Sequence, residues 1–498
     1  MRDILVDFVP QDGRRRPNCR SVVFPKKSKN NGSIKCVQIK RLRPTQDARR
    51  VLNDFELTAH VEEAKPCPLY EEYESQHFLL LQFQKSCRRA VVEKVVRSGL
   101  WVQVEGEVTK TQYKFFGHSP TQLRSRHCVL YSADLERKYG SYERIISTFG
   151  TFSTINNVSK RAARIGLLLS TAKPAVELDD TQVELIEDIE HDNFKFTDGC
   201  GLISPDIAEK IEIYPIKHQY ENQVYKFPSV YQIRFKGCKG VLMLDETLNN
   251  KIVLRKSLIK FAWNPHKTKN WLRIVEDGKA VSFPNSHSAL NLQYIRLLSA
   301  LGVPDSAFLR KLDTYFDELS RILEDQEVQV RHLCAHRRYD LAERVLTTNS
   351  VDAETRRELE HYRMTCRMSK PRTVQQWKHG VRDRSKEDKI KVILPLEKCR
   401  FVFGVADISE KLEYECCYFQ PTIRGRPTVL EGVQVVVGKS PSYHVGDMRV
   451  LNCVNVPECR HLVDCLVFPV KGQLSIQINT LRYYKRFLVR LVYFARPR

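Results

Sequence analysis

The chain has 498 residues, of which 42% are hydrophobic, so it is long enough for about three domains with buried cores. Its 81 Lys and Arg residues outnumber its 59 Asp and Glu residues, and the net charge of +22 suggests an anionic partner such as nucleic acid, with a generally basic, solvated surface as an equal alternative. No hydrophobic run approaches the roughly 18 residues of a membrane span, and the N-terminus lacks a signal peptide, so we expect an intracellular protein, nuclear or cytoplasmic, with no membrane partner.

The first 190 residues combine strand-like runs with helical stretches. Residues 1–76 carry basic clusters such as GRRRPNCR, and we expect them to form an exposed basic arm. Residues 78–84 and 99–108 have the composition of strands, whereas 135–150 has helical spacing. Residues 179–193, DDTQVELIEDIEHDN, form an acidic island that we interpret as a solvated domain boundary, with metal binding as the alternative.

Basic hairpin-like segments follow between residues 194 and 265. FTDGCGLISPDIAEKI is a glycine-rich turn followed by a short helix, for which Ser204 is the expected N-cap. VYQIRFKGCKGVLMLD predicts two strands around a basic turn and contains Arg234 and Lys239, and IVLRKSLIKFAWNP contains Arg255 and Lys260. Arginine forks and lysine charges hold phosphate oxygens, so these segments could clamp a triphosphate or an RNA backbone. Solvated hairpins are the alternative.

The remaining chain is first helical and then strand-rich. Apolar spacing predicts helices over 301–385, a basic stretch surrounds Trp377, and short strands joined by turns from residue 386 onward are typical of a small barrel. The chain has 15 cysteines and no CxxC pair, which favours reduced thiols over a disulfide framework or a zinc ribbon. Four residues could be imagined as metal ligands, although their apolar surroundings favour core positions: Cys453, Cys459, His461 and Cys465.

Eight segments carry a resemblance to one family, and they occur in the family's order across most of residues 77–473. They are FFGHSPTQLRSRHCVLY, FGTFSTINNVSKRAARIGLLLS, FTDGCGLIS, YQIRFKGCKGVLMLD, LRKSLIKF, CRFVFGVAD, KSPSYHVGDMRVLNCV and HLVDCLVFPVKG. The chain resembles the eukaryotic cell-encoded RNA-dependent RNA polymerases of RNA silencing. One such segment would be weak support, but eight collinear segments make the resemblance specific.

The resemblance implies an α+β fold built as a two-barrel polymerase core, with barrels of the double-psi type separated by a helical neck and with the second barrel incomplete. The expected organisation is a basic N-terminal arm over 1–76, a slab and linker region over 77–190, a first barrel over 191–300, a neck over 301–385, the first part of a second barrel over 386–473 and a divergent basic, aromatic tail over 474–498.

The resemblance also implies an activity and partners. Family members extend RNA on an RNA template from nucleoside triphosphates and make double-stranded precursors of small interfering RNA, and they work with the silencing proteins Dicer and Argonaute. Arg234 and Lys239 match basic active-site positions of the family, and Arg255 and Lys260 are further matches. Their expected role is to hold the triphosphate and the template-product backbone.

The expected catalytic aspartates are missing. In the family, the FPVKG strand precedes a DxDGD loop whose carboxylates hold catalytic Mg²⁺, but this sequence departs at Gln473, and residues 474–498 contain no Asp or Glu. We therefore assign no catalytic residue and no metal ligand, and expect the chain alone to be inactive. The tail is interpreted as another exon, an altered reading frame or an incomplete gene model, and Asp447 and Asp464 as structural residues.

Two alternatives without catalysis remain. One is an RNA-binding paralogue, in which the basic and aromatic residues of the tail bind single strands by charge and stacking. The other is a regulatory, dominant-negative subunit that docks on a complete polymerase through the exposed edge of an unfinished barrel. The tail residues concerned are Arg482, Tyr483, Tyr484, Lys485, Arg486, Phe487, Arg490, Tyr493, Phe494, Arg496 and Arg498.

Overall fold

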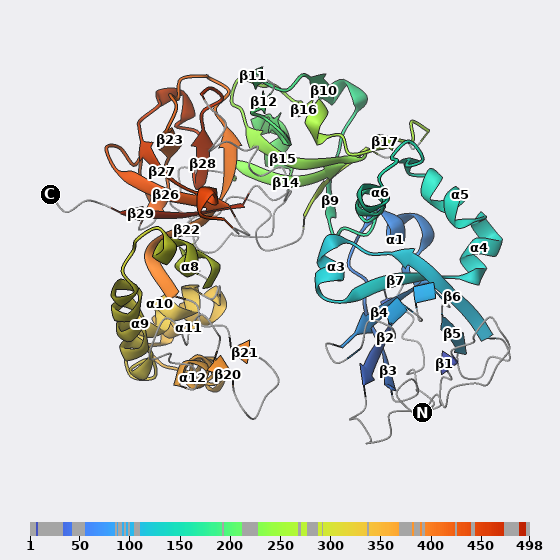
Figure 1. Ribbon diagram of the computed structural model, residues 1–498, viewed down its shortest axis with the longest axis horizontal. Coiled ribbons are helices and arrows are strands. Elements are labelled where there is room, and N and C mark those ends of the chain that lie inside the picture. The colour runs from blue at the N-terminus through green and yellow to red at the C-terminus, as the bar shows by residue number, and fades with distance from the viewer. Residues whose placement is uncertain are drawn as a thin grey trace. The chain divides into compact units, whose positions relative to one another are not determined.

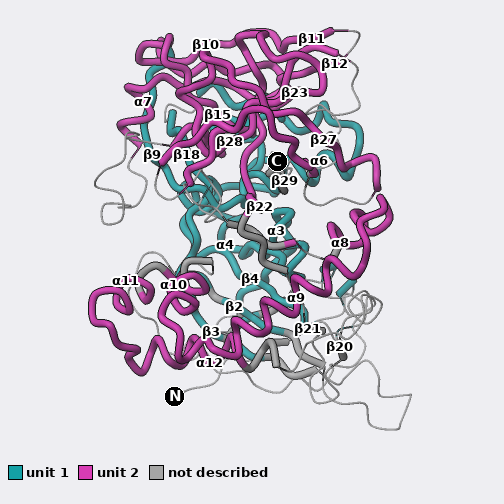
Figure 2. Tube along the Cα trace, turned by 90° about the vertical axis from the view of Figure 1, so that its left-hand side faces the viewer, with its two compact units in different colours: residues 1–180, 233–239, 259–280 teal, residues 181–232, 240–258, 281–498 magenta. Residues whose placement is uncertain are grey.

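The chain forms helices and strands in two compact units. Unit 1 comprises residues 1–180, 233–239 and 259–280, and unit 2 comprises residues 181–232, 240–258 and 281–498 (Figure 2). The structure, a computed structural model, describes residues 6–7, 33–41, 55–84, 87, 92–93, 96–97, 100–103, 110–191, 194–211, 228–266, 270–275, 287–290, 292–335, 338–367, 381–382, 389–390, 394–423, 426–439, 444–472 and 488–494. The expected α+β class is confirmed in its coarse form.

Unit 1 contains a seven-stranded sheet in the order β1-β5-β6-β7-β4-β2-β3 (Figure 1). In that order its strands are Val6–Asp7, Leu100–Gln103, Lys110–Gly117, His127–Ser132, Phe78–Phe83, Ser33–Arg41 and Phe55–Glu63. Strands β2 and β3 come from the region that composition alone assigns to a basic arm. Strand β2 belongs to the sheet because its apolar positions Ile34 and Val37 are buried, and β3 pairs with β2 along its whole length.

Helices of unit 1 begin at short polar residues that accept backbone hydrogen bonds. Ser119, Ser132, Ser141 and Asn157 each accept from the amide three residues ahead, which satisfies donors that a helix leaves unpaired. The helices are α1 (Pro68–Tyr73), α3 (Pro120–Arg124), α4 (Ala133–Tyr139), α5 (Tyr142–Ser147) and α6 (Val158–Ile165).

A second seven-stranded sheet has the order β10-β16-β13-β15-β14-β18-β9. These strands are Val183–Ile186, Ile252–Arg255, Cys200–Ile203, Cys238–Leu244, Val230–Phe235, Trp271–Ile274 and Lys173–Glu177. The tip of the β14–β15 hairpin, residues 233–239, belongs to unit 1, and its base belongs to unit 2. Strand β13 leads into helix α7 (Pro205–Lys210), and the hydroxyl of Ser204 accepts from Ile207 N, so the predicted N-cap is confirmed.

The strands near the C-terminus of unit 2 close into a ring. In the order β22-β28-β23-β27-β26-β29 each strand pairs with the next, and β29 pairs again with β22. The strands are Leu394–Ala406, Cys465–Phe468, Cys416–Phe419, Met448–Cys453, Gln434–Lys439 and Leu488–Phe494, and β19 (His287–Leu290) adds to β22.

This ring corrects one sequence-based expectation. Strand β29 comes from the segment that the sequence analysis interprets as a divergent basic, aromatic tail, and it supplies the strand between β22 and β26. The expected exposed edge of an unfinished barrel is therefore not found among the six paired strands. The physical reason is that LVRLVYF has the β-branched and aromatic residues that favour strands, despite its basic charge.

The predicted helices over 301–385 are confirmed as far as Arg367, whereas Val381–Arg382 form the short strand β20 and a further helix, α8 (Leu292–Ala300), precedes the predicted region. The other helices are α9 (Asp305–Ser320), α10 (Gln326–Ala335), α11 (Tyr339–Thr348) and α12 (Ala353–Arg367). On α9, Phe308, Leu312, Tyr315 and Leu319 recur at three- and four-residue spacing and are all buried, as an amphipathic helix requires. No helix in the described ranges is both long enough and apolar enough to cross a membrane.

Candidate functional site

Arg234 lies near the end of β14 in unit 1 and is buried, with 9% of its surface exposed. Its Nη1 donates to Ile233 O at 2.7 Å and its Nη2 to Ser170 Oγ at 3.2 Å, whereas its buried Nε has no hydrogen-bond partner among the described residues. Burial alone lowers the pKa of Arg234 to about 10. A buried guanidinium without a compensating carboxylate is typical of a site that receives an anion.

The tip of the β14–β15 hairpin brings two of the predicted lysines into one segment. Cys238 pairs with Ile259 in an isolated antiparallel bridge, and Lys260 N donates to Gly237 O at 3.0 Å. Lys239 and Lys260, each next to a residue of that bridge, are both partly buried. Gly237 is required here because its φ is +72° and a Cβ would lie 2.5 Å from Phe261 O.

A further lysine, Lys236, belongs to the same turn. Its ammonium pairs with Asp180 Oδ1 at 2.9 Å, and Asn270 Nδ2 donates to the same oxygen at 2.9 Å. The hydrogen bond and the charge of Lys236 hold the pKa of Asp180 below its usual value. The charges of Lys260 and Lys236 both act on the Cys238 thiol, although burial dominates and raises its pKa to about 12. The turn is therefore a local concentration of positive charge.

Arg255 ends strand β16 in unit 2 and is also buried, with 5% exposed. Its Nη1 donates to Glu187 O at 2.7 Å, and its buried Nε has no partner within the described part of the chain. Burial lowers the pKa of Arg255, and the negative charge of Asp188 acts in the opposite direction. Arg255 thus shares two properties with Arg234: burial and an unused donor.

Asp188 ties the segment after Arg255 to the glycine-rich turn. Its Oδ2 accepts from Ser257 N at 2.9 Å, and its Oδ1 accepts from Ser257 Oγ at 2.6 Å and from Thr197 Oγ1 at 3.0 Å. Ser257 Oγ in turn accepts from Gly199 N at 2.7 Å. Because Asp188 is only 8% exposed, the interpretation of the acidic island as a solvated face is wrong at this position.

The glycine-rich turn at residues 198–201 lies so close to strand β15 that a side chain would not fit at Gly240. A Cβ at Gly240 would lie 2.2 Å from Gly199 O, which accepts a hydrogen bond from Val241 N at 3.0 Å. The geometry of this turn therefore depends on glycine at position 240 and on the hydrogen bonds of Asp188. Sequence reasoning missed Asp188 and Ser257, although the placement of Asp188 between Ile186 and Ile189 hinted at burial.

The described carboxylates near the closed ring do not fit a magnesium site. Asp407 accepts from Ser409 N at 3.0 Å and Leu412 N at 2.7 Å, and Asp464 accepts from Thr422 N at 2.8 Å and Thr422 Oγ1 at 2.7 Å. Burial raises the pKa of Asp464 to about 6. These carboxylate oxygens accept backbone and side-chain hydrogen bonds that stabilise the fold. A cluster of oxygen ligands suited to Mg²⁺ is not found in the ranges that the structure describes.

The cysteines considered as ligands occupy core positions instead. Cys453 Sγ lies 3.7 Å from Cys417 Sγ, Cys459 Sγ lies 3.9 Å from Asp407 Oδ1, and His461 Nε2 lies 3.2 Å from Leu244 O. Asp447 accepts from His444 N at 3.3 Å in a short turn. Most of the basic stretch around Trp377, apart from 381–382 and 389–390, lies outside the described residues. So do the tail residues Arg482, Tyr483, Tyr484, Lys485, Arg486, Phe487, Arg496 and Arg498.

Comparisons with known proteins agree with the resemblance. A family model described as RNA dependent RNA polymerase matches residues 58–478. The chain is 32% identical over 388 residues to the probable RNA-dependent RNA polymerase SHL2 of Oryza sativa subsp. japonica, covering 73% of this chain and 29% of that protein. It is 30% identical over 383 residues to RNA-dependent RNA polymerase 6 of Arabidopsis thaliana, covering 72% and 29%.

A solved structure supports the fold. The RNA dependent RNA polymerase QDE-1 from Thielavia terrestris superposes with a TM-score of 0.62 at 16% identity, covering 94% of this chain and 54% of that one. The chain spans about three tenths of the length of the two curated relatives above. Since the family model covers most of the sequence, this chain belongs to the RNA-dependent RNA polymerase family.

Proposed function

We propose that this chain is part of an RNA-directed RNA polymerase of RNA silencing, which copies an RNA template from nucleoside triphosphates into double-stranded RNA, the precursor of small interfering RNA. The observation that carries the proposal is the pair of buried arginines, Arg234 and Arg255, each with an unused Nε donor. A buried cation of this kind is destabilising by itself, and it becomes favourable when a phosphate contacts it.

In this proposal the four basic residues bind phosphates. Arg234 and Arg255 offer rigid, pre-positioned guanidinium groups, whose fork geometry matches phosphate oxygens. Lys239 and Lys260 add positive charge near the hairpin tip, where the tight Gly237 turn brings them into one segment. Fixed charges of this type would bind the triphosphate and the RNA backbone, and would stabilise charge on the transferred phosphoryl group.

We also propose the domain organisation and barrel type. The first double-psi barrel would lie within 191–300, the neck within 301–385 and the second barrel from 386 onward, after an N-terminal region over 1–76 and a slab and linker over 77–190. The closed ring that contains β22 and β29 supports a barrel in the last region. In this proposal residues 474–498 contribute β29 to that barrel.

Catalysis would need carboxylates that the described residues do not supply. Nowhere in the 498 residues are two aspartates separated by a single residue, so the DxDxD arrangement is absent from this sequence. We propose that residues 1–498 alone do not polymerise RNA, and that the divalent cation of the family, expected to be Mg²⁺, needs ligands from outside them. The polymerase would act inside the cell with the silencing machinery, including Dicer and Argonaute.

Three measurements test this proposal. The chain should bind single-stranded RNA in a salt-dependent manner and should incorporate no labelled nucleotide on an RNA template with Mg²⁺ present. Sequencing of the transcript across the codon for Gln473 should reveal an in-frame region that encodes an Asp-rich loop. Nucleotide incorporation by the 498 residues would contradict the proposed inactivity, and a lack of RNA binding would contradict the proposed substrate.

The net charge of +22 favours a second candidate, a non-catalytic RNA-binding or regulatory paralogue. Both candidates predict RNA binding, but only the polymerase predicts a transcript that continues in frame into an Asp-rich loop. A transcript that ends after Arg498 in every tissue sampled, together with RNA binding that depends on Lys239 and Lys260, would favour the paralogue.

A further inference from the structure

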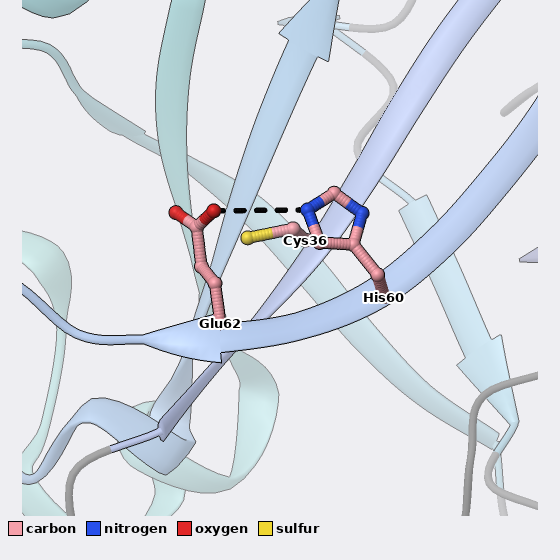
Figure 3. Close-up of side chains that lie close together, drawn as sticks. All are labelled: Cys36, His60 and Glu62. Carbon is pink, nitrogen blue, oxygen red and sulfur yellow. Dashed lines mark ion pairs between the residues drawn. The ribbon is translucent and has the colours of Figure 1, made fainter. Parts of the chain in front are cut away.

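Three side chains of metal-binding type meet on one face of the β2–β3 hairpin in unit 1 (Figure 3). Cys36 on β2 is the direct cross-strand partner of His60 on β3. Glu62 lies two residues beyond His60 and therefore on the same face of that strand. One sulfur, one imidazole nitrogen and one carboxylate oxygen of these residues all lie within 4.8 Å of one another.

The three groups differ in exposure in a way that suits a bound ion. Cys36 is buried, with 4% exposed, whereas the side chains of His60 and Glu62 are 53% and 47% exposed. His60 Nε2 lies 3.6 Å from Glu62 Oε2, the ion pair drawn as a dashed line in Figure 3. An ion could therefore enter from the solvent side and reach the thiol at the inner end of the cluster.

The charges of the three groups suit a divalent cation. Binding through Sγ would release the thiol proton to water, and the cation would then be balanced by one thiolate and one carboxylate. The occupied cluster would then carry no net charge beside the hydrophobic core that includes Cys36.

We propose that Cys36, His60 and Glu62 form a zinc-type site that binds one divalent cation and fastens the edge strand β3 to β2. Thiolate, imidazole and carboxylate are zinc ligands, and a tetrahedral ion would leave one position to water. Mg²⁺ is excluded by the soft sulfur ligand, so this site is separate from any magnesium used in polymerisation.

The test is the zinc content of the purified, tag-free 498-residue chain after dialysis against metal-free buffer. We expect one zinc ion per chain in the wild type, and close to none in Cys36→Ala, His60→Ala or Glu62→Gln. Two matched controls should keep their zinc: Cys128→Ala, a buried cysteine of β7, and Glu63→Gln, the exposed neighbour of Glu62. Zinc that persists in Cys36→Ala, or a wild type without zinc, would overturn the proposal.

A spectroscopic readout on the wild type remains valid if a variant does not fold. Replacing zinc by Co²⁺ should give a thiolate-to-cobalt charge-transfer band, and excess Mg²⁺ should not remove it. A chelator should abolish the band and lower the thermal unfolding midpoint, and added zinc should restore the midpoint. A cobalt complex without the thiolate band would also overturn the proposal.

Discussion

Replacing Asp188 by asparagine tests whether the hydrogen bonds of this buried carboxylate hold residues 254–257 next to the glycine-rich turn at 198–201. Asp188 accepts three hydrogen bonds, and one of its donors is the amide of Ser257. Asparagine keeps the shape but turns one acceptor into a donor. Ser257 Oγ is already an acceptor for Gly199 N, so the new amide group would compete with that bond.

The expected loss follows from the number of charged bonds affected. Each hydrogen bond to a charged buried group contributes about 1.5 to 3 kcal/mol, so Asp188→Asn should destabilise this region by about 3 kcal/mol. At about 1.4 kcal/mol per factor of ten, the amides of Gly199 and Ser257 should exchange with solvent roughly 100-fold faster. Hydrogen exchange measured by mass spectrometry on peptides covering 197–201 and 255–258 provides the assay.

A matched control lies in the same acidic segment. Asp180 is exposed and pairs with Lys236, so Asp180→Asn should leave the exchange of both peptides unchanged. Unchanged exchange in Asp188→Asn as well would refute the reasoning, because the network would then not limit the opening of this region. Faster exchange throughout the chain would instead indicate global unfolding, which urea denaturation of the same variant distinguishes.

Two further predictions concern single residues, and a third concerns the C-terminal strand β29. Burial raises the pKa of Asp464 to about 6, above the usual value of about 3.9, so its contribution to the free energy of unfolding is present below about pH 4 and is lost as the pH rises through about 6. In urea unfolding measured at several pH values, Asp464→Asn should remove about 3 kcal/mol of this pH dependence. A pH profile equal to that of the wild type would contradict the burial argument. Gly237→Ala should lower the free energy of unfolding by about 3 kcal/mol, because its Cβ would clash with Phe261 O. Gly302 also has a positive φ but lies in open space, so Gly302→Ala should lower the free energy of unfolding by only about 1 kcal/mol. Equal decreases for the two variants would exclude the clash. Deletion of 488–498 should open the ring and cause aggregation measurable by light scattering, and a monodisperse truncated chain would show that β29 is dispensable.

The family and the local elements could be predicted from sequence because both depend on short stretches. Collinear motifs pointed to the polymerase family, the spacing of Phe308, Leu312, Tyr315 and Leu319 predicted helix α9, and the position of Ser204 predicted a helix start. Each of these signals is contained in a few neighbouring residues.

Features that depend on pairing of distant strands were missed. Strand β29 was not predicted because it lies in a basic segment of the sequence. Its composition also does not show that β22 and β26 pair with it on either side. Cys36 and His60 become neighbours only through the register of the β2–β3 hairpin. Asp188 was interpreted as solvated together with its charged neighbours, although its carboxylate accepts hydrogen bonds from Ser257 and Thr197.

The most direct test of the proposed function measures RNA affinity against salt concentration by fluorescence anisotropy. Wild type should be compared with Lys239→Gln, Lys260→Gln and Arg255→Gln, and with Arg356→Gln on the exposed face of α12 as a charge-matched control. Each lost phosphate contact should reduce the slope of log affinity against log salt by roughly 0.7 for single-stranded RNA, and the control should retain the wild-type slope. Identical slopes for all variants would contradict phosphate binding by these residues.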